Sequence, residues 1–439
     1  MLQTIINALK VKEIRRKVYM MLLLLLVFRI GCFIPVPGLD RETFSSVVSK
    51  NDFLNLMSSI TGGALSQGTI FALGIGPYIN ASIIMQLLSV GIPALERLSK
   101  QGEEGRKKIA QYTRYVTILL AVVQSIGIIV GFGSSSIQKA LFFNQEWLAY
   151  VFMVVVYTAG ALIVMWLGER ITDYGVGNGQ SMIIFVGILA TAGKAILDQI
   201  VSIFTGSTTN MANTIWGLVA FLLVCVVLFF AIIYVDLSER KVPVQYAKQI
   251  KGRKMYGGQS SAIPIRISGG GVMPLIFSFS ILSFPQMICS LVDPSSQGWF
   301  TQFWTNYMSA SAEGWGAVVY AFVLCLLIFA FSFFYAQMQF NPEDVSKSIQ
   351  QNGGFIQGIR PGKATEAYLK KISNRITLFG AIYLSLVAFI PSVAFAWANL
   401  QLVNVFSTTG ILIVVSCAME LEKQLQAQLM MKNYKGFLK

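Results

Sequence analysis

The 439-residue chain is 55% hydrophobic and 12% charged, and it carries a formal net charge of +14 without a single histidine. This much apolar surface exceeds what a soluble domain of this length can bury, which indicates a membrane protein. The absence of histidine excludes a histidine base and the commonest zinc sites. The five cysteines lie in apolar runs without a C-x-x-C pair, which favours packing over metal binding. We expect no metal and no cofactor.

Ten apolar stretches predict membrane-spanning helices, because about 20 residues cross a hydrocarbon core and a helix satisfies its own backbone groups there. The first stretch ends in Ile34-Pro35-Val36-Pro37-Gly38 instead of a small-residue cleavage site, so it indicates a retained span and not a signal peptide. The predicted spans are residues 19–35, 70–92, 115–132, 148–168, 181–200, 214–235, 272–292, 316–338, 376–396 and 403–419.

The charge distribution gives these spans an orientation. Of the 34 lysines and arginines, 29 would lie on one side, four on or toward the other, and Arg29 within the first span. A missed or invented span in mid-chain would invert every later loop and destroy this asymmetry. Because cytoplasmic loops are rich in Lys and Arg, both termini are predicted to be cytoplasmic. Orientation and anionic headgroups together account for most of the net charge.

The stretch Leu56 to Gly68 follows the first span and is too small and polar to cross lipid alone, yet too apolar for an ordinary loop. A short re-entrant or plug-like helix fits both properties, since irregular backbone at membrane depth needs protein or water around it. A surface amphipathic helix outside the membrane is the alternative. Next, Ile75 and Ile79 fall one turn apart on one helix face, which suits core packing as well as a pore lining.

Two segments between later spans are long for a helix bundle and carry more basic residues than orientation needs, at about 236–270 and 339–375. They are candidate docking surfaces for an acidic or nucleic-acid partner. Between them, the seventh span follows three glycines and contains Pro274, Ile276 and Pro285, and such helices bend more easily.

Three classes of function remain open: a channel, a secondary carrier and an intramembrane enzyme. Ion-coupled carriers usually place ionisable groups in the bundle, whereas these spans hold only Arg29 and Lys194, each near a span end. No phosphate loop, nucleotide fingerprint or zincin motif is complete, so we expect no enzymatic activity. Small-solute transport stays as the alternative to a channel.

The chain resembles the SecY family of protein-conducting channels along nearly its entire length. The order and spacing of several motifs carry the resemblance. They are RIGCFIPVPGLD at 29–40, GGALS at 62–66, IFALGIGPYI at 70–79, ASIIMQL at 81–87, GRKKIAQYTR at 105–114, WLGE at 166–169, GNG at 177–179, GQS at 258–260, NP at 341–342 and GIRPG at 358–362.

The resemblance implies an all-α fold of about ten transmembrane helices in two inverted five-helix halves, residues 1–205 and 206–439, around an hourglass pore. It also implies a ring of apolar side chains at mid-membrane. A further ring position, usually aliphatic in the family, matches Gln180 here. The ring positions that match the family are Ile75, Ile79, Ile184, Ile276 and Ile413.

The resemblance further makes the segment around residues 56–68 a plug for the outer funnel, and places a lateral gate between spans two and three and spans seven and eight. The core of the plug comprises Ser58, Ser59, Ile60, Thr61, Gly62, Gly63, Ala64, Leu65 and Ser66. Such a channel passes unfolded secretory polypeptides across the bacterial cytoplasmic membrane and releases hydrophobic segments sideways into lipid.

The implied partners are small membrane subunits similar to SecE and SecG, the SecA motor ATPase, the ribosome with its RNA, and the secretory and membrane proteins that are transported. Arg253 and Lys254 in the first basic segment, and Arg360 in the second, match family positions that engage the ribosome or the motor. For Arg253 and Lys254, simple orientation charge is an equal alternative.

Overall fold

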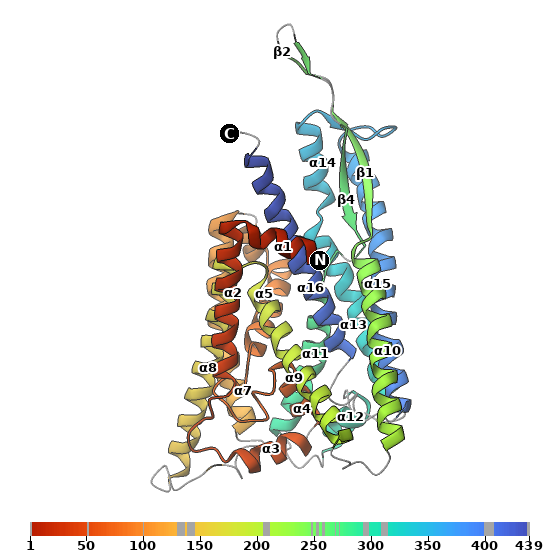
Figure 1. Ribbon diagram of the computed structural model, residues 1–439. Coiled ribbons are helices and arrows are strands. Elements are labelled where there is room, and N and C mark those ends of the chain that lie inside the picture. The colour runs from red at the N-terminus through yellow and green to blue at the C-terminus, as the bar shows by residue number, and fades with distance from the viewer. Residues whose placement is uncertain are drawn as a thin grey trace.

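A computed structural model describes residues 2–50, 52–99, 101–129, 137, 145–204, 211–246, 249–251, 254–256, 260–267, 269–271, 273–292, 298–308, 315–398 and 408–436. Long helices run side by side and form the body of the molecule, with a small sheet projecting beyond one end (Figure 1). The first half of the chain contributes α1 (Leu2–Lys10), α2 (Lys12–Gly31), α3 (Arg41–Lys50), α4 (Asp52–Ile60), α5 (Gly76–Gly91), α6 (Pro93–Ser99), α7 (Glu103–Ile128), α8 (Glu146–Tyr174) and α9 (Gly179–Phe204).

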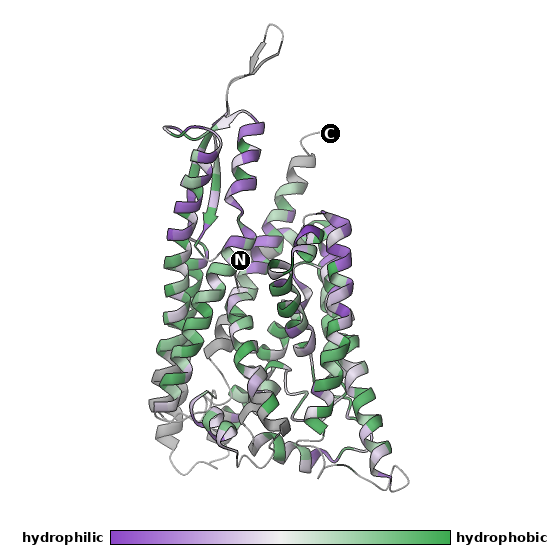
Figure 2. Ribbon diagram, turned by 180° about the vertical axis from the view of Figure 1, so that it is seen from behind, coloured by the Kyte–Doolittle hydropathy of each residue, from purple (hydrophilic) through white to green (hydrophobic). Residues whose placement is uncertain are grey.

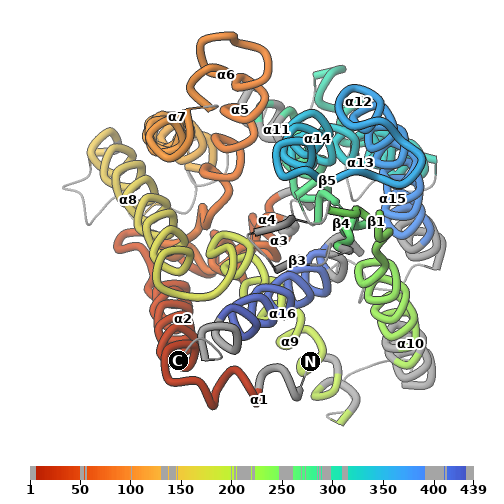
Figure 3. Tube along the Cα trace, turned by 90° about the horizontal axis from the view of Figure 1, so that it is seen from above, coloured from red at the N-terminus to blue at the C-terminus, as the bar shows by residue number. Residues whose placement is uncertain are grey.

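The second half contributes further helices and all of the described strands. The helices are α10 (Met211–Asp236), α11 (Met273–Val292), α12 (Trp299–Tyr307), α13 (Trp315–Gln339), α14 (Pro342–Gln351), α15 (Lys363–Ala398) and α16 (Thr408–Gly436). The strands are β1 (Glu239–Tyr246), β2 (Gln249–Lys251), β3 (Lys254–Tyr256), β4 (Ser260–Arg266) and β5 (Gly354–Phe355). Seen from above, α1–α8 and α10–α15 occupy opposite sides, and α16 lies against α9 and α10 (Figure 3).

The long helices have the composition of membrane spans. By length and hydropathy, four stretches of the described residues could cross a membrane: 147–174, 179–198, 315–351 and 363–390. A fifth results if α5 and α6, bent by 104° at their junction, count as one span. Leu223–Asp236 and Met273–Ser283 are shorter apolar helices. A polytopic helical membrane fold is therefore observed, while the number of ten spans stays a prediction.

Apolar side chains also cover the outside of the bundle, as expected for helices that face lipid. Leu26, Phe230 and Phe322 are each about 60% exposed or more. Apolar colouring follows the long helices, and hydrophilic residues gather on α14 and on the adjoining part of α15 (Figure 2). Helix α1 and the final turns of α16 lie toward the end that carries the sheet, whereas α3, α4 and α12 lie at the opposite end (Figure 1).

The second span differs from the predicted helix over residues 70–92. Residues 61–75 form consecutive turns, and α5 begins only at Gly76. Gly62, Gly63, Gly68 and Gly74 all have positive φ angles, which glycine adopts at little cost. Pro77 occupies the first turn of α5, where its missing N–H is harmless. The glycines therefore keep this stretch out of the helix, and Pro77 marks where the helix can start.

The two segments expected as long loops contain regular structure. β1 pairs antiparallel with β4 and with β5, which gives the strand order β4-β1-β5. Val242 and Val244 on β1 pack into one buried cluster with Ile349 on α14 and Leu369 on α15. Asn341 caps α14 by accepting a hydrogen bond from the Glu343 N–H at 3.1 Å. A separate apolar core thus orders this basic region outside the bundle.

Polar contacts tie neighbouring helices to each other. Arg114 on α7 donates two hydrogen bonds to the carboxylate of Glu169 on α8, at 2.8 and 2.9 Å. Lys423 on α16 donates to the backbone carbonyl of Asp236 at 2.7 Å and pairs with its carboxylate at 3.2 Å. The Lys423 and Asp236 side chains are only 20% and 11% exposed. The Lys423–Asp236 ion pair therefore fixes α16 to the end of α10, and solvent screens this pair less than it screens an exposed one.

Gly160 on α8 allows the irregular segment to approach the helix closely. A Cβ at Gly160 would lie 1.9 Å from the carbonyl oxygen of Ile70, so Gly160→Ala must push the segment away. We expect the thermal midpoint of the purified protein to fall, with a cost of about 1–3 kcal/mol as for other overpacked sites. Gly193→Ala on α9 is the matched control, because a Cβ there meets no atom within 4 Å. Equal midpoints for the two variants would contradict this packing.

Candidate functional site

A cavity of about 90 Å³ lies where helices from both halves of the chain converge. Four of the predicted ring residues line it, each from a different helix: Ile79 from α5, Ile184 from α9, Ile276 from α11 and Ile413 from α16. Ile184, Ile276 and Ile413 are at most 6% exposed. The fold thus brings together residues that are up to 334 positions apart in sequence.

The fifth predicted ring residue, Ile75, does not line this cavity but belongs to the same apolar cluster and is 4% exposed. It immediately precedes α5, and its carbonyl accepts a hydrogen bond from the Ile79 N–H at 3.1 Å. The two side chains therefore lie one turn apart, as their spacing predicted. A Cβ on Gly168 would lie 3.5 Å from both Ile75 and Gln180, so both side chains approach α8 at Gly168.

The rest of the lining is apolar or neutral. Asn80, Gln124, Ser280 and Ser283 are among its polar members, from α5, α7 and α11. None of the described lining residues carries a titratable side chain. An apolar constriction of this kind can exclude water and ions.

One side of the cavity is covered by α4 and the turns that follow it. Met57, Ile60, Thr61 and Leu65 face the cavity from this side. The segment satisfies many of its own polar groups, because the Ser58 carbonyl accepts from the Gly63 N–H at 2.8 Å and from the Thr61 hydroxyl at 3.1 Å. It therefore forms a compact unit instead of part of a spanning helix.

The predicted plug residues lie within this unit and are mostly buried. Ala64 and Leu65 are 0% and 1% exposed, and Ser58 and Thr61 are 4% and 6% exposed. Gly62 is buried too, while Ser59, Ile60, Gly63 and Ser66 are half-buried. Ser66 closes the unit, since its N–H donates to the Ser58 hydroxyl at 3.2 Å and its hydroxyl donates to the Gly63 carbonyl at 2.9 Å.

Contacts from α9 hold the unit in place. The Thr191 hydroxyl donates to the Ser59 carbonyl at 2.9 Å. A Cβ at Gly187 would lie 2.6 Å from the Ile60 carbonyl oxygen, so only glycine permits this approach. Neither Thr191 nor the cavity-lining Gln124 was predicted from the sequence. The signal for Gln124 was available, because a lone amide inside an apolar span needs a reason to be there.

A seam between the two halves runs beside the cavity. Helix α5 contacts α11, and α7 contacts α11 as well. The hydroxyl of Tyr335 on α13 donates to the side-chain carbonyl of Gln86 on α5. Tyr335 also packs edge-on against Phe277 of α11, with ring centroids 5.0 Å apart. The lateral gate is predicted between these same helices.

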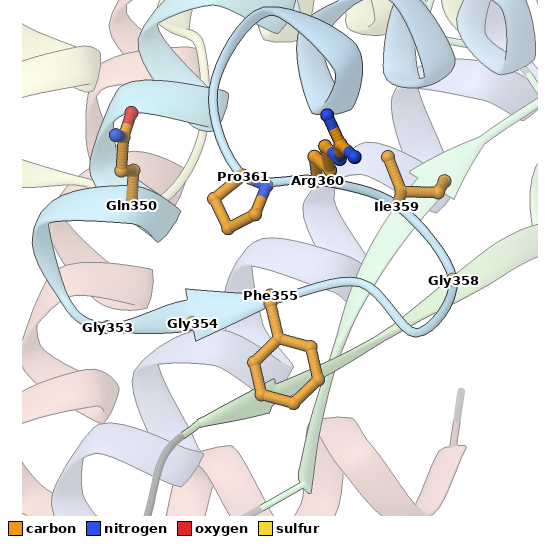
Figure 4. A pocket seen from close by; sticks show the side chains of 8 residues that line it. All are labelled: Gln350, Gly353, Gly354, Phe355, Gly358, Ile359, Arg360 and Pro361. Carbon is orange, nitrogen blue, oxygen red and sulfur yellow. The ribbon is translucent and has the colours of Figure 1, made fainter.

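Arg360 lies at the tip of the second basic segment and is exposed, beside an open hollow of about 600 Å³ (Figure 4). Its loop turns at Gly358 and Gly362, with φ angles of 81° and 98°. The Thr365 hydroxyl fixes the loop by donating to the Arg360 carbonyl at 2.9 Å. A hydrogen bond to Glu343 raises the pKa of the nearby Lys347.

Arg253 lies outside the described residues, and only the backbone of Lys254, at the start of β3, is described.

Comparisons with known proteins agree on one family. A family model named SecY matches residues 69–421. The protein translocase subunit SecY of Halalkalibacterium halodurans is 40% identical over 440 residues and covers 100% of both chains. The subunit of the same name from Streptomyces coelicolor is 38% identical, again over 100% of both chains.

Solved structures of low sequence identity share the fold. One described as the structure of a protein conducting channel has a TM-score of 0.68 and 20% identity, and covers 95% of this chain and 93% of that one. Another, of Sec61 in the canine ribosome-channel complex, has a TM-score of 0.62 and 18% identity with the same coverage. The chain therefore belongs to the SecY family of protein translocase subunits.

Proposed function

We propose that the chain forms a channel that passes unfolded secretory polypeptides across the bacterial cytoplasmic membrane and releases hydrophobic segments sideways into lipid. The observation that carries this proposal is the convergence of isoleucines from four helices on one cavity, covered by α4 and the turns that follow it. A binding site would need specific polar partners for its ligand, whereas this lining is suited to excluding water.

The ring provides the seal of the resting channel. Ile75, Ile79, Ile184, Ile276 and Ile413 together form the constriction. Isoleucine side chains present apolar surface without directional bonds, so they can fit around different polypeptide side chains without retaining any of them. While the channel rests, the narrow apolar passage excludes water and restrains ions. Gln180 would lie to one side of this seal, where it approaches α8 at Gly168.

Residues 58–66 act as the plug, which leaves when a polypeptide enters. The two halves, 1–205 and 206–439, then separate along the seam between α5 and α7 on one side and α11 and α13 on the other. A sufficiently hydrophobic segment in the pore would contact lipid through this opening and move into it, because transfer of apolar surface out of water is favourable. The Tyr335–Gln86 hydrogen bond crosses the seam and must break in this movement.

The basic end of the molecule is the docking face for the partners that drive transport. Both termini are cytoplasmic in this orientation, as the distribution of Lys and Arg predicts. Arg253, Lys254 and Arg360 would engage the ribosome, including its RNA, or a motor similar to SecA. Small subunits similar to SecE and SecG would cover part of the exposed apolar surface of the bundle. Movement of the polypeptide then depends on these partners or on the membrane potential.

A secondary transporter of a small solute is the alternative function. Coupling to an ion usually needs an ionisable group near the substrate. The described lining of the cavity contains none, which favours the channel.

Ile413→Asn tests the ring. Ile413 faces the cavity at 5% exposure, so an amide there should hydrate the constriction and relax the requirement for a functional signal sequence. Export of a precursor with a defective signal should rise by about tenfold, measured by pulse labelling, since the seal loses roughly one buried aliphatic side chain. Val415→Asn is the matched control, because Val415 is equally buried at 4% but belongs to a separate apolar cluster and does not line the cavity. If both variants show the same phenotype, the effect of Ile413→Asn comes from general destabilisation and not from loss of the seal.

Arg360→Glu tests the docking face. Reversing this exposed charge should slow motor-driven export about tenfold, because close charge pairs across an interface contribute about 1.4 kcal/mol or more. The variant itself should still insert in the membrane. The rate is measured with inverted vesicles and purified motor. Lys363→Glu makes the same charge change three residues later on an exposed side chain and should have a smaller effect. Export by Arg360→Glu at the wild-type rate would reject the assignment.

A further inference from the structure

Arg29 is the one cation that the sequence places within the first predicted span, and neither the ring nor the gate uses it. It lies in the last turn of α2 and is half-buried. Its Nη1 atom donates a hydrogen bond to the backbone carbonyl of Gly62 at 2.8 Å. The guanidinium also lies over the ring of Phe33, 5.1 Å from the centroid. Its acceptor therefore belongs to the plug itself.

No carboxylate forms an ion pair with Arg29 among the described residues. A cation at membrane depth is costly, and such residues usually pair with a charge or with backbone carbonyls. Here the pairing depends on the position of the plug. If Gly62 moves away, the guanidinium loses its backbone acceptor and keeps the ring of Phe33 and the neighbouring thiol of Cys32. The arginine is therefore better accommodated when the channel is closed than when the plug has left.

The backbone conformation and close packing at Gly62 favour its contact with Arg29. Gly62 has a φ of 72°, and a Cβ there would lie 2.7 Å from Arg29 Nη1 and 3.0 Å from the Cα of Gly187 on α9. The plug backbone is thus held between α2 and α9 at a point where only glycine fits. On the α9 side, the Thr191 hydroxyl donates to the Ser59 carbonyl at 2.9 Å. The plug is therefore tied at two carbonyls three residues apart, that of Gly62 from the α2 side and that of Ser59 from the α9 side.

We propose that Arg29 is a positioning residue that latches the plug and sets how strong a signal sequence must be to open the channel. The inference rests on the proposed function of residues 58–66 as a plug. A charge-assisted hydrogen bond is stronger than a neutral one and is strengthened further where water is scarce. Opening must break this bond. An entering segment therefore displaces the plug only if its own binding in the channel releases more free energy than the loss of this bond costs.

The test replaces Arg29 in the full-length chain, assembled with its membrane subunits. Arg29→Met keeps the length of the side chain but removes the donor, and Arg29→Lys keeps the charge but not the planar fork. Two quantities are measured: export of a precursor with a defective signal, and halide leak through the resting channel in vesicles. We expect Arg29→Met to raise both by about tenfold or more, as for the loss of a charged hydrogen bond, and Arg29→Lys to lie between it and the wild type.

Arg41→Met is the matched control. Arg41 also donates to this region of the chain, at 3.0 Å to Oε1 of Gln67, but the contact is exposed. Its loss should leave both quantities close to wild type, because exposed polar contacts contribute little. An equal rise from Arg41→Met would overturn the specific role of Arg29.

Deletion of residues 58–66 separates failure of the latch from failure of the plug. If the deletion raises the leak but Arg29→Met and Arg29→Lys do not, the plug is real and the latch is rejected. If the deletion leaves the leak unchanged, the plug and the latch are both rejected. If Arg29→Met does not accumulate in the membrane, Arg29→Lys decides, since it retains the cation: a leak at the wild-type level in that variant rejects the latch.

Discussion

Backbone groups that lie inside a bilayer must find hydrogen-bond partners within the protein, and the rest of this structure depends on how residues 61–75 meet that constraint without a helix. Side chains of the segment supply part of the answer, as when the Thr69 hydroxyl donates to the Ala64 carbonyl at 3.1 Å. Neighbouring chain supplies the rest, because the Ile70 N–H donates to the Ile34 carbonyl at 3.0 Å. An irregular segment can therefore sit among spanning helices at acceptable free energy.

The same arrangement separates the rigid long helices from the segment that moves in the proposed mechanism. The long helices keep their own backbone bonds whatever the segment does, and glycines such as Gly160 and Gly187 let it approach them closely. In the proposed mechanism, residues 58–66 move as one unit, because the segment satisfies many polar groups internally and hydrogen bonds from Arg29 and Thr191 hold it to α2 and α9. The isoleucines that meet beneath it come from four different helices, so separation of those helices widens the constriction.

Local signals in the sequence predicted much of this arrangement. Long apolar runs indicated the helices, the 75/79 spacing placed two isoleucines one turn apart, and small polar residues at 58–66 argued against a span. The start of α5 at Gly76, instead of near residue 70, was missed because hydropathy does not register four glycines with positive φ. The Arg29–Gly62 contact and the β1–β4 pairing were missed because they join residues far apart in the chain, for which one sequence gives no periodic signal.

Site-specific photocrosslinking can show whether a polypeptide passes through the isoleucine ring. A photoreactive residue replaces Ile79 or Ile276 in native membranes that hold a secretory chain stalled partway through synthesis. A probe at Leu326 on α13, which is 57% exposed on the outside of the bundle, is the control. The account predicts crosslinks from both ring positions, dependent on a functional signal sequence, and none for a secretory segment from Leu326. A membrane-targeted stalled chain that crosslinks to neither ring position would contradict the account and return these isoleucines to core packing.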